Sequence, residues 1–145
     1  ARLVHKGSRR CVISLGTMLE QSRQLCDRLE GEGVSTSLVD ARFAKPFDKD
    51  LFIQMAHEHD AMCIVEVSSP GGFSAHLLQY LANQGALDNG LVVRVASLPD
   101  SYIDHAERNS QLEQAGLDPE SLYQICQQML LGCPVKTSSA KSAQT

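Results

Sequence analysis

This 145-residue chain lacks several features that would assign a function at once. None of its apolar runs approaches the roughly 20 residues that a membrane-spanning helix needs, so we expect no membrane partner. Its 13 lysine and arginine residues are outnumbered by 17 acidic residues, for a formal net charge of -4. The basic residues form no stripe, which argues against a nucleic-acid partner. The apolar fraction of 43% is still sufficient for a packed core.

Motifs for cofactors, metals and catalysis are also missing. A dinucleotide site needs Gly-x-Gly-x-x-Gly directly after a strand, and only Gly16 stands at that point. The sequence contains no P-loop, no zinc cluster and no catalytic triad. It also lacks Gly-Asp-Gly followed at a distance by Asn, the pattern that holds Mg²⁺ and diphosphate in thiamine diphosphate enzymes. From the residues alone we predict an accessory α/β domain with no catalytic, cofactor-binding or metal-binding residue.

The five cysteines form no Cys-x-x-Cys pair. Cys11 and Cys63 lie in apolar runs typical of strands, and Cys26 and Cys126 lie in helical patterns. We interpret the cysteines as reduced, buried thiols of an intracellular protein, with a metal or redox role as the alternative.

What the sequence does contain is a regular alternation of strand and helix patterns. Short runs rich in β-branched residues predict strands, and apolar residues at helical spacing predict helices between them. The strands are predicted at residues 2–5, 11–15, 34–39, 62–65 and 91–96, and the helices at 17–29, 51–57, 73–81, 110–115 and 119–131. This order predicts an α/β fold with three α/β/α layers around a five-stranded, mostly parallel sheet with one antiparallel edge strand. We assign the domain to residues 1–131 and expect 132–145 to be a disordered tail.

Local signals indicate how these elements are joined and capped. Residues 6–9, Lys-Gly-Ser-Arg, are typical of a turn, so the first two strands are predicted to form a hairpin. Thr17 and Glu20 match a capping box at the start of the first helix. Asp48 and Asp118 are the predicted N-caps of two later helices.

The loops at the carboxyl ends of the strands are the expected place for a ligand or partner. Asp40 lies near the position of a ribose-binding acid, but the same spacing occurs in any doubly wound sheet. A free-standing anion- or nucleotide-binding module that uses Gly16-Thr17 and Gly71-Gly72 is an alternative function, because helix starts bind anions readily.

Residues 72–76, Gly-Phe-Ser-Ala-His, form half of a Gly-x-Ser-x-Gly nucleophile elbow. His76 replaces the second glycine, so we interpret Ser74 as a first-turn or capping residue. Gly71 and Gly72 are expected to allow close backbone approach at a packing corner. Phe73 is expected to fill the core there or an interface with another domain.

Three histidines and one loop are also candidate sites. On a helix, His57 and His59 would point to different faces, so they are predicted to form a solvated helix end and not to bind one metal ion. His76 is expected to be a buried residue with its hydrogen bonds satisfied, or an interface contact. The loop in which Arg42 and Lys45 flank Phe43 is either a solvated turn or a segment that docks on another domain.

Four sequence blocks follow one another along the chain: D-A-R-F-A-K-P-F-D at residues 40–48, G-G-F with a following histidine at 71–76, L-P-D-S-Y-I-D-H at 98–105, and a leucine with A-G-L at 112–117. In this order they resemble the C-terminal domain of 1-deoxy-D-xylulose-5-phosphate synthase, a transketolase-like enzyme. The chain departs from that family at Val67 and Ser74, where a second acidic residue and a glycine are usual. The last two blocks argue against the alternative of a 2-oxo acid dehydrogenase β subunit.

The resemblance implies the third domain of a homodimeric transferase that condenses pyruvate with glyceraldehyde 3-phosphate for isoprenoid and thiamine precursor biosynthesis. Thiamine diphosphate and Mg²⁺ would be held by the missing N-terminal and central domains, so this chain is expected to bind neither and to be inactive alone. The expected compartment is a bacterial cytoplasm or the plastid stroma. The candidate domain-interface residues are Arg42, Phe43, Lys45, Gly71, Gly72, Phe73 and His76.

Overall fold

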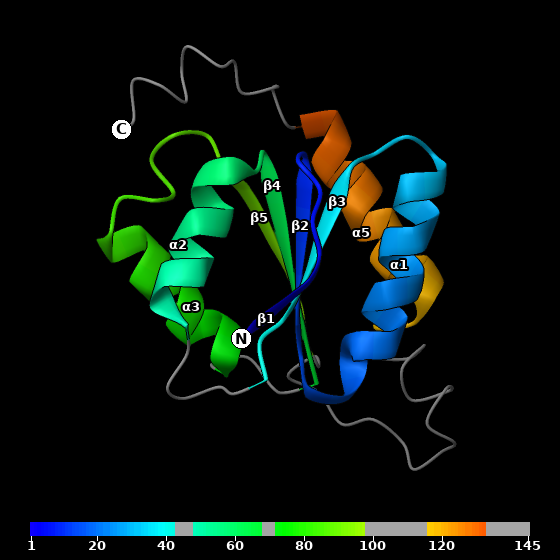
Figure 1. Ribbon diagram of the computed structural model, residues 1–145, viewed down its shortest axis with the longest axis horizontal. Coiled ribbons are helices and arrows are strands. Elements are labelled where there is room, and N and C mark those ends of the chain that lie inside the picture. Colours follow the sequence, from blue (N-terminus) through cyan, green and yellow to red (C-terminus); the bar gives the residue numbers. More distant parts are fainter. Residues whose placement is uncertain (43–47, 68–71, 98–115, 133–145) are drawn as a thin grey trace.

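A computed structural model describes residues 1–42, 48–67, 72–97 and 116–132 (Figure 1). The strands are β1 (Arg2–His5), β2 (Arg10–Leu15), β3 (Thr36–Asp40), β4 (Ala61–Glu66) and β5 (Val92–Ala96), and they form one sheet in the order β1-β3-β2-β4-β5. The helices are the 3-10 turn η1 (Gly16–Met18), α1 (Leu19–Gly31), α2 (Lys49–Glu58), α3 (Phe73–Asn83) and α5 (Pro119–Gly132). The predicted α/β class and mixed five-stranded sheet are confirmed.

The helices cover both faces of the sheet, with α1 and α5 on one face and α2 and α3 on the other (Figure 1). Because successive side chains of a strand point to opposite faces, each central strand supplies both layers. Val12 and Val65 belong to the core beneath α1 and α5, whereas Ile13 and Ile64 belong to the core beneath α2 and α3. β4 is buried along its whole length, as expected of a strand covered on both sides.

The hairpin predicted for β1 and β2 is wrong, although β1 is the antiparallel edge strand. β1 pairs with β3, and β3 pairs in parallel with β2. Residues 6–9 therefore cross the amino end of β3, where the Gly7 N–H donates to Ser37 Oγ at 2.8 Å. A Cβ atom on Gly7 would lie 2.4 Å from the backbone nitrogen of Thr36, so this crossing requires glycine. This short connection therefore passes across β3, which lies between β1 and β2, and does not form the turn of a hairpin.

The helix start predicted at Thr17 is displaced, because Thr17 lies inside η1 and is not the N-cap of α1. Gly16 has a φ of +73° and leads into η1, and α1 begins only at Leu19. The N-cap of α1 is Met18, which makes no side-chain cap hydrogen bond. Since Met18 is fully buried, packing of its side chain determines how the chain enters this helix.

The two other predicted N-caps are confirmed. At the start of α2, Asp48 Oδ1 accepts a hydrogen bond from the Leu51 N–H at 3.1 Å. Before α5, Asp118 Oδ2 accepts from the Ser121 N–H at 3.2 Å. Both carboxylates lie at the positive end of a helix dipole, which stabilises them.

Some sequence predictions fall outside the described residues. They are the helix at 110–115, the loop positions Phe43, Lys45 and Gly71, and all of the tail predicted at 132–145 except Gly132, which is the last residue of α5. Within the described part of the chain, no helix has the length and apolar character needed to cross a membrane.

Candidate functional site

The carboxyl ends of β2 and β4 form the topological switch point of the sheet. From β2 the chain runs through α1 to β3 on one side, and it then returns through α2 to β4 on the other side. The two strands are paired so that Leu15 lies opposite Glu66. In open α/β sheets a ligand usually binds in the crevice at such a point, so functional side chains are expected first at this edge.

Glu66, the last residue of β4, places a fully buried carboxylate at this edge. Its Oε1 accepts a hydrogen bond from the Ser74 backbone N–H at 3.1 Å and another from the Ser74 hydroxyl at 2.5 Å. Because Ser74 lies in the first turn of α3, the carboxylate is at the positive end of that helix. Glu66 therefore caps α3 from the neighbouring strand.

This cap bears on two interpretations of the sequence. Ser74 is a first-turn residue, as predicted. The residue is only 4% exposed and its hydroxyl donates to Glu66, so the hydroxyl is not available as a nucleophile. The Glu66 carboxylate also occupies the place where a phosphate would accept hydrogen bonds at the helix start. A second anion there would be repelled, which argues against the anion-binding alternative at Gly71-Gly72.

The role of Glu66 was missed by the sequence interpretation. The available signal was an acidic residue that ends a continuous apolar strand just before a helix. Its second oxygen, Oε2, makes no hydrogen bond to any residue in the described ranges. A buried carboxylate oxygen of this kind usually accepts from an ordered water or another polar group.

Arg42, a predicted interface residue, follows β3 at the same edge of the sheet. It is exposed, and its φ of +62° is uncommon for a residue other than glycine. Its backbone N–H donates to Asp40 Oδ1 at 3.1 Å, which stabilises this conformation. The exposed Arg42 side chain therefore extends from a tightly turned stretch of backbone at the surface.

The other described interface candidates lie at the start of α3. Gly72 is the N-cap of the helix. Phe73 is buried and contacts Phe52 in a T-shaped arrangement, with ring centroids 5.8 Å apart, so it fills the core, one of the two places expected for it. His76 is exposed, which excludes its buried alternative and leaves the interface contact as a prediction.

The prediction of a solvated helix end is correct for His57 and wrong for His59. His59 is fully buried at the amino end of the sheet. Its Nδ1–H donates to the Met55 carbonyl at 2.8 Å, which leaves Nε2 to accept from the Ser37 hydroxyl at 2.7 Å. Since Ser37 also accepts from the Gly7 N–H, this buried serine–histidine pair links α2, β3 and the β1–β2 connection. Long-range contacts of this kind leave no local signal in the sequence.

The four cysteines in the described ranges are free and buried, as predicted. Burial raises the pKa of Cys11 well above its ordinary value and that of Cys26 to about 12. A hydrogen bond between Cys63 and Cys126 raises the pKa of Cys63 and lowers that of Cys126. Across the described residues, no group of three or more His, Cys, Asp or Glu side chains could hold a metal ion.

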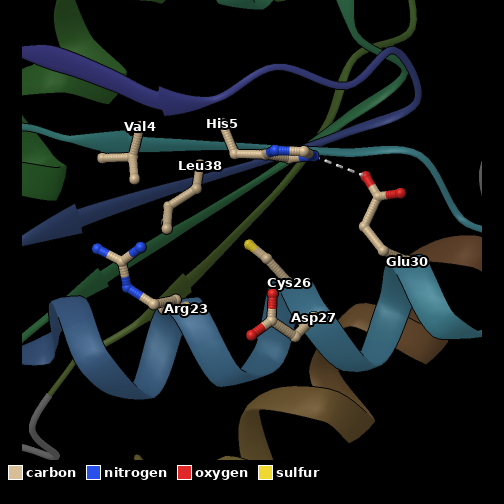
Figure 2. Close-up of a pocket in the computed structure, with 7 residues that line it drawn as sticks. All are labelled: Val4, His5, Arg23, Cys26, Asp27, Glu30 and Leu38. Atoms are coloured by element: carbon tan, nitrogen blue, oxygen red, sulfur yellow. Dashed lines mark hydrogen bonds and ion pairs between the residues drawn. The ribbon is translucent and has the colours of Figure 1, made fainter.

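A groove of about 310 Å³ lies between α1 and the strands β1 and β3 (Figure 2). It is lined by Val4, His5, Arg23, Cys26, Asp27, Glu30 and Leu38. Glu30 Oε1 accepts from the Thr36 N–H at 2.9 Å and lies 3.2 Å from His5 Nε2, and these contacts lower the pKa of Glu30. The sequence interpretation missed this groove because the groove depends on the pairing of β1 with β3, where a hairpin of β1 with β2 was predicted.

Comparisons with known proteins agree with this architecture. The family described as "Transketolase, C-terminal domain" matches residues 1–122. A solved structure of a split-gene transketolase, described as an inactive β4 tetramer, matches 92% of this chain with a TM-score of 0.82 and 22% sequence identity. The present chain spans 43% of the length of that protein chain. At this identity the structural likeness shows the fold alone, whereas the family match extends over most of the sequence.

Proposed function

Because this chain belongs to the transketolase C-terminal domain family, we propose that it is the C-terminal domain of a larger thiamine-diphosphate-dependent transferase, specifically 1-deoxy-D-xylulose-5-phosphate synthase. The observation that carries this assignment is the ordered set of sequence blocks at residues 40–48, 71–76, 98–105 and 112–117. In this proposal, the N-terminal and central domains bind thiamine diphosphate and Mg²⁺ and join pyruvate to glyceraldehyde 3-phosphate with loss of CO₂.

The side chains at the switch point favour a supporting role for this domain in that reaction. The Glu66 carboxylate accepts a hydrogen bond from the start of α3, and Phe73 is buried in the core. Arg42 and His76 remain exposed at the same edge. We therefore propose that these two residues contact the neighbouring domain or the second subunit of a homodimer.

A 2-oxo acid dehydrogenase β subunit is the second candidate, and the family match is compatible with it as well. The two candidates differ in the acceptor of the two-carbon unit that pyruvate supplies. A synthase transfers it to glyceraldehyde 3-phosphate, whereas a dehydrogenase component transfers it to a lipoyl group. The L-P-D and A-G-L blocks favour the synthase.

The full-length enzyme that contains this domain separates these candidates in one assay. With pyruvate, glyceraldehyde 3-phosphate, thiamine diphosphate and Mg²⁺, we expect CO₂ release together with formation of 1-deoxy-D-xylulose 5-phosphate. Transfer to a lipoyl domain, with no sugar phosphate product, would support the dehydrogenase and contradict the synthase.

The interface role of Arg42 can be tested in the same full-length enzyme. Arg42→Ala is expected to weaken subunit or domain assembly by about tenfold, because arginines buried at interfaces often contribute more than 1 kcal/mol. Arg94→Ala removes an exposed arginine on β5 and is the matched control. Equal assembly of both variants in analytical ultracentrifugation and limited proteolysis would exclude Arg42 from the interface.

A further inference from the structure

The groove beside α1 has no role in the proposed function. Its floor is apolar, whereas its rim carries charged side chains. Val4 and Leu38 belong to the apolar core beneath α1 and form the floor of the groove. The thiol of Cys26 points from α1 toward these strands (Figure 2). Cys26 is only 3% exposed, and the raised pKa of its thiol, about 12, keeps it protonated. The floor is thus an uncharged surface suited to an aliphatic chain.

The rim of the groove is formed by Asp27 and Glu30, by Arg23, and by His5, whose Nε2 lies 3.2 Å from Glu30 Oε1; with His5 neutral, the rim holds one more carboxylate than cation. The Asp27 carboxylate is exposed and makes no hydrogen bond or ion pair with the side chain of another described residue. Glu30 stays ionised to a lower pH than usual because its pKa is lowered. Arg23 is the opposing cation, but its Nε lies 3.8 Å from Glu20 Oε2, so its charge is shared with a third carboxylate.

We propose that this groove binds a lysine or arginine side chain presented by a partner polypeptide. The aliphatic part of such a side chain would lie on Val4 and Leu38, and its cationic end would reach Asp27 and Glu30, as long basic side chains do when they cover apolar surface. β1 is the last strand in the sheet order, so an extended partner segment can approach along its outer edge. This inference does not depend on the identity of the enzyme.

Titration of the isotope-labelled chain with n-butylguanidinium, followed by two-dimensional NMR, tests the chemistry of the groove. We expect saturable shifts of the backbone amides of the groove residues. Titrations with n-butylsulfonate and 1-butanol are the matched controls for charge and for apolar contact. Equal or larger shifts with either control, or no groove shifts with the guanidinium compound, would overturn the proposal.

Variants that remove one carboxylate charge test whether n-butylguanidinium binds at the rim of the groove. Asp27→Asn is expected to weaken n-butylguanidinium binding roughly two- to fivefold, the range for an exposed ion pair. Asp50→Asn makes the same change at an exposed position on α2 and should leave the affinity unchanged. Both side chains are exposed, so both variants should fold, which their spectra will verify. Unchanged affinity in the Asp27 variant would overturn the assignment of the cation to this rim.

A short peptide tests whether the occupant is a side chain of an extended segment. The peptide acetyl-Thr-Val-Arg-Val-Thr-amide should bind more tightly than n-butylguanidinium, because its backbone can pair with β1. Replacing its arginine by glutamine should weaken binding by at least the factor found for Asp27→Asn. Binding of the glutamine peptide with the same affinity, or binding of the arginine peptide away from the groove, would contradict the proposal.

Discussion

The carboxyl end of β4 and the groove beside α1 both carry carboxylates, but the two regions use them differently. Glu66 is buried, and its Oε1 accepts two hydrogen bonds from Ser74 of the same domain. Asp27 is exposed on the rim of the groove and has no such contact with a described residue. A buried charge must be matched by groups within the protein, whereas an exposed charge is stabilised by water that a partner can replace.

This difference shows that the position of a carboxylate in the fold does not by itself determine whether it stabilises the domain or is available to a partner. The switch point is where doubly wound sheets commonly bind ligands. In this domain the helix start at that point is capped by the protein's own carboxylate, while uncommitted negative charge lies beside the edge strand. Substitutions in the two regions should therefore have different consequences, with stability affected at the first and partner binding at the second.

The largest stability effect is expected from Glu66→Ala. Loss of the carboxylate leaves the buried Ser74 N–H without its acceptor, and hydrogen bonds to charged groups contribute about 1.5–3 kcal/mol each. We therefore expect the free energy of unfolding in urea to fall by about 2–3 kcal/mol. Glu66→Gln keeps one acceptor oxygen and should lose less. An alanine variant as stable as the wild type would show that Glu66 does not cap α3.

A smaller loss, about 1 kcal/mol, is expected from Ser74→Ala, which removes the hydroxyl but keeps the backbone N–H. The double variant with Glu66→Ala should lose less than the sum of the single variants, because both remove the same hydrogen bond. Chemical denaturation of all four proteins measures this coupling. Strict additivity would mean that the two side chains act independently.

In the groove, Glu30→Gln should change stability little, and the change should depend on pH. The Thr36 N–H, and then His5, lower the pKa of Glu30 below its ordinary value of 4.5 in the folded protein. The stabilisation from ionised Glu30 is therefore present above that value and is lost as the pH falls through the folded pKa. Between about pH 5 and pH 3, the stability difference between wild type and variant should shrink. A difference that grows on acidification would contradict this assignment.

The smallest effect is expected at Cys26, on the floor of the groove. Because its pKa is about 12, little thiolate forms at neutral pH. Iodoacetamide should label Cys26 in the folded chain far more slowly than in urea, as measured by peptide mass spectrometry. Fast labelling in the folded state would show that the groove opens more deeply than described.

Much of this fold could be predicted from local sequence patterns. The alternation of apolar runs and helical spacing identified the strands and the described helices, and Asp48 and Asp118 marked two helix starts correctly. These features depend on residues within a few positions of one another. The prediction for Thr17 failed because burial of Met18, a tertiary contact, determines how the helix begins.

The features that the sequence did not reveal all depend on contacts between distant segments. The position of β3 between β1 and β2 follows from the crossover through α1, so a short turn was mistaken for a hairpin. The sequence predicts a solvated His59 because its partner Ser37 lies on β3, 22 positions earlier in the chain. The same limit applies to the groove, whose lining joins β1, β3 and α1.

Calorimetric titration of this chain with thiamine diphosphate in the presence of Mg²⁺ tests the central proposal most directly. If the chain is a supporting domain whose cofactor is held by the rest of the enzyme, the titration should give no saturable heat. The full-length enzyme should bind the cofactor under the same conditions. Saturable binding of thiamine diphosphate by this chain alone would contradict the proposal.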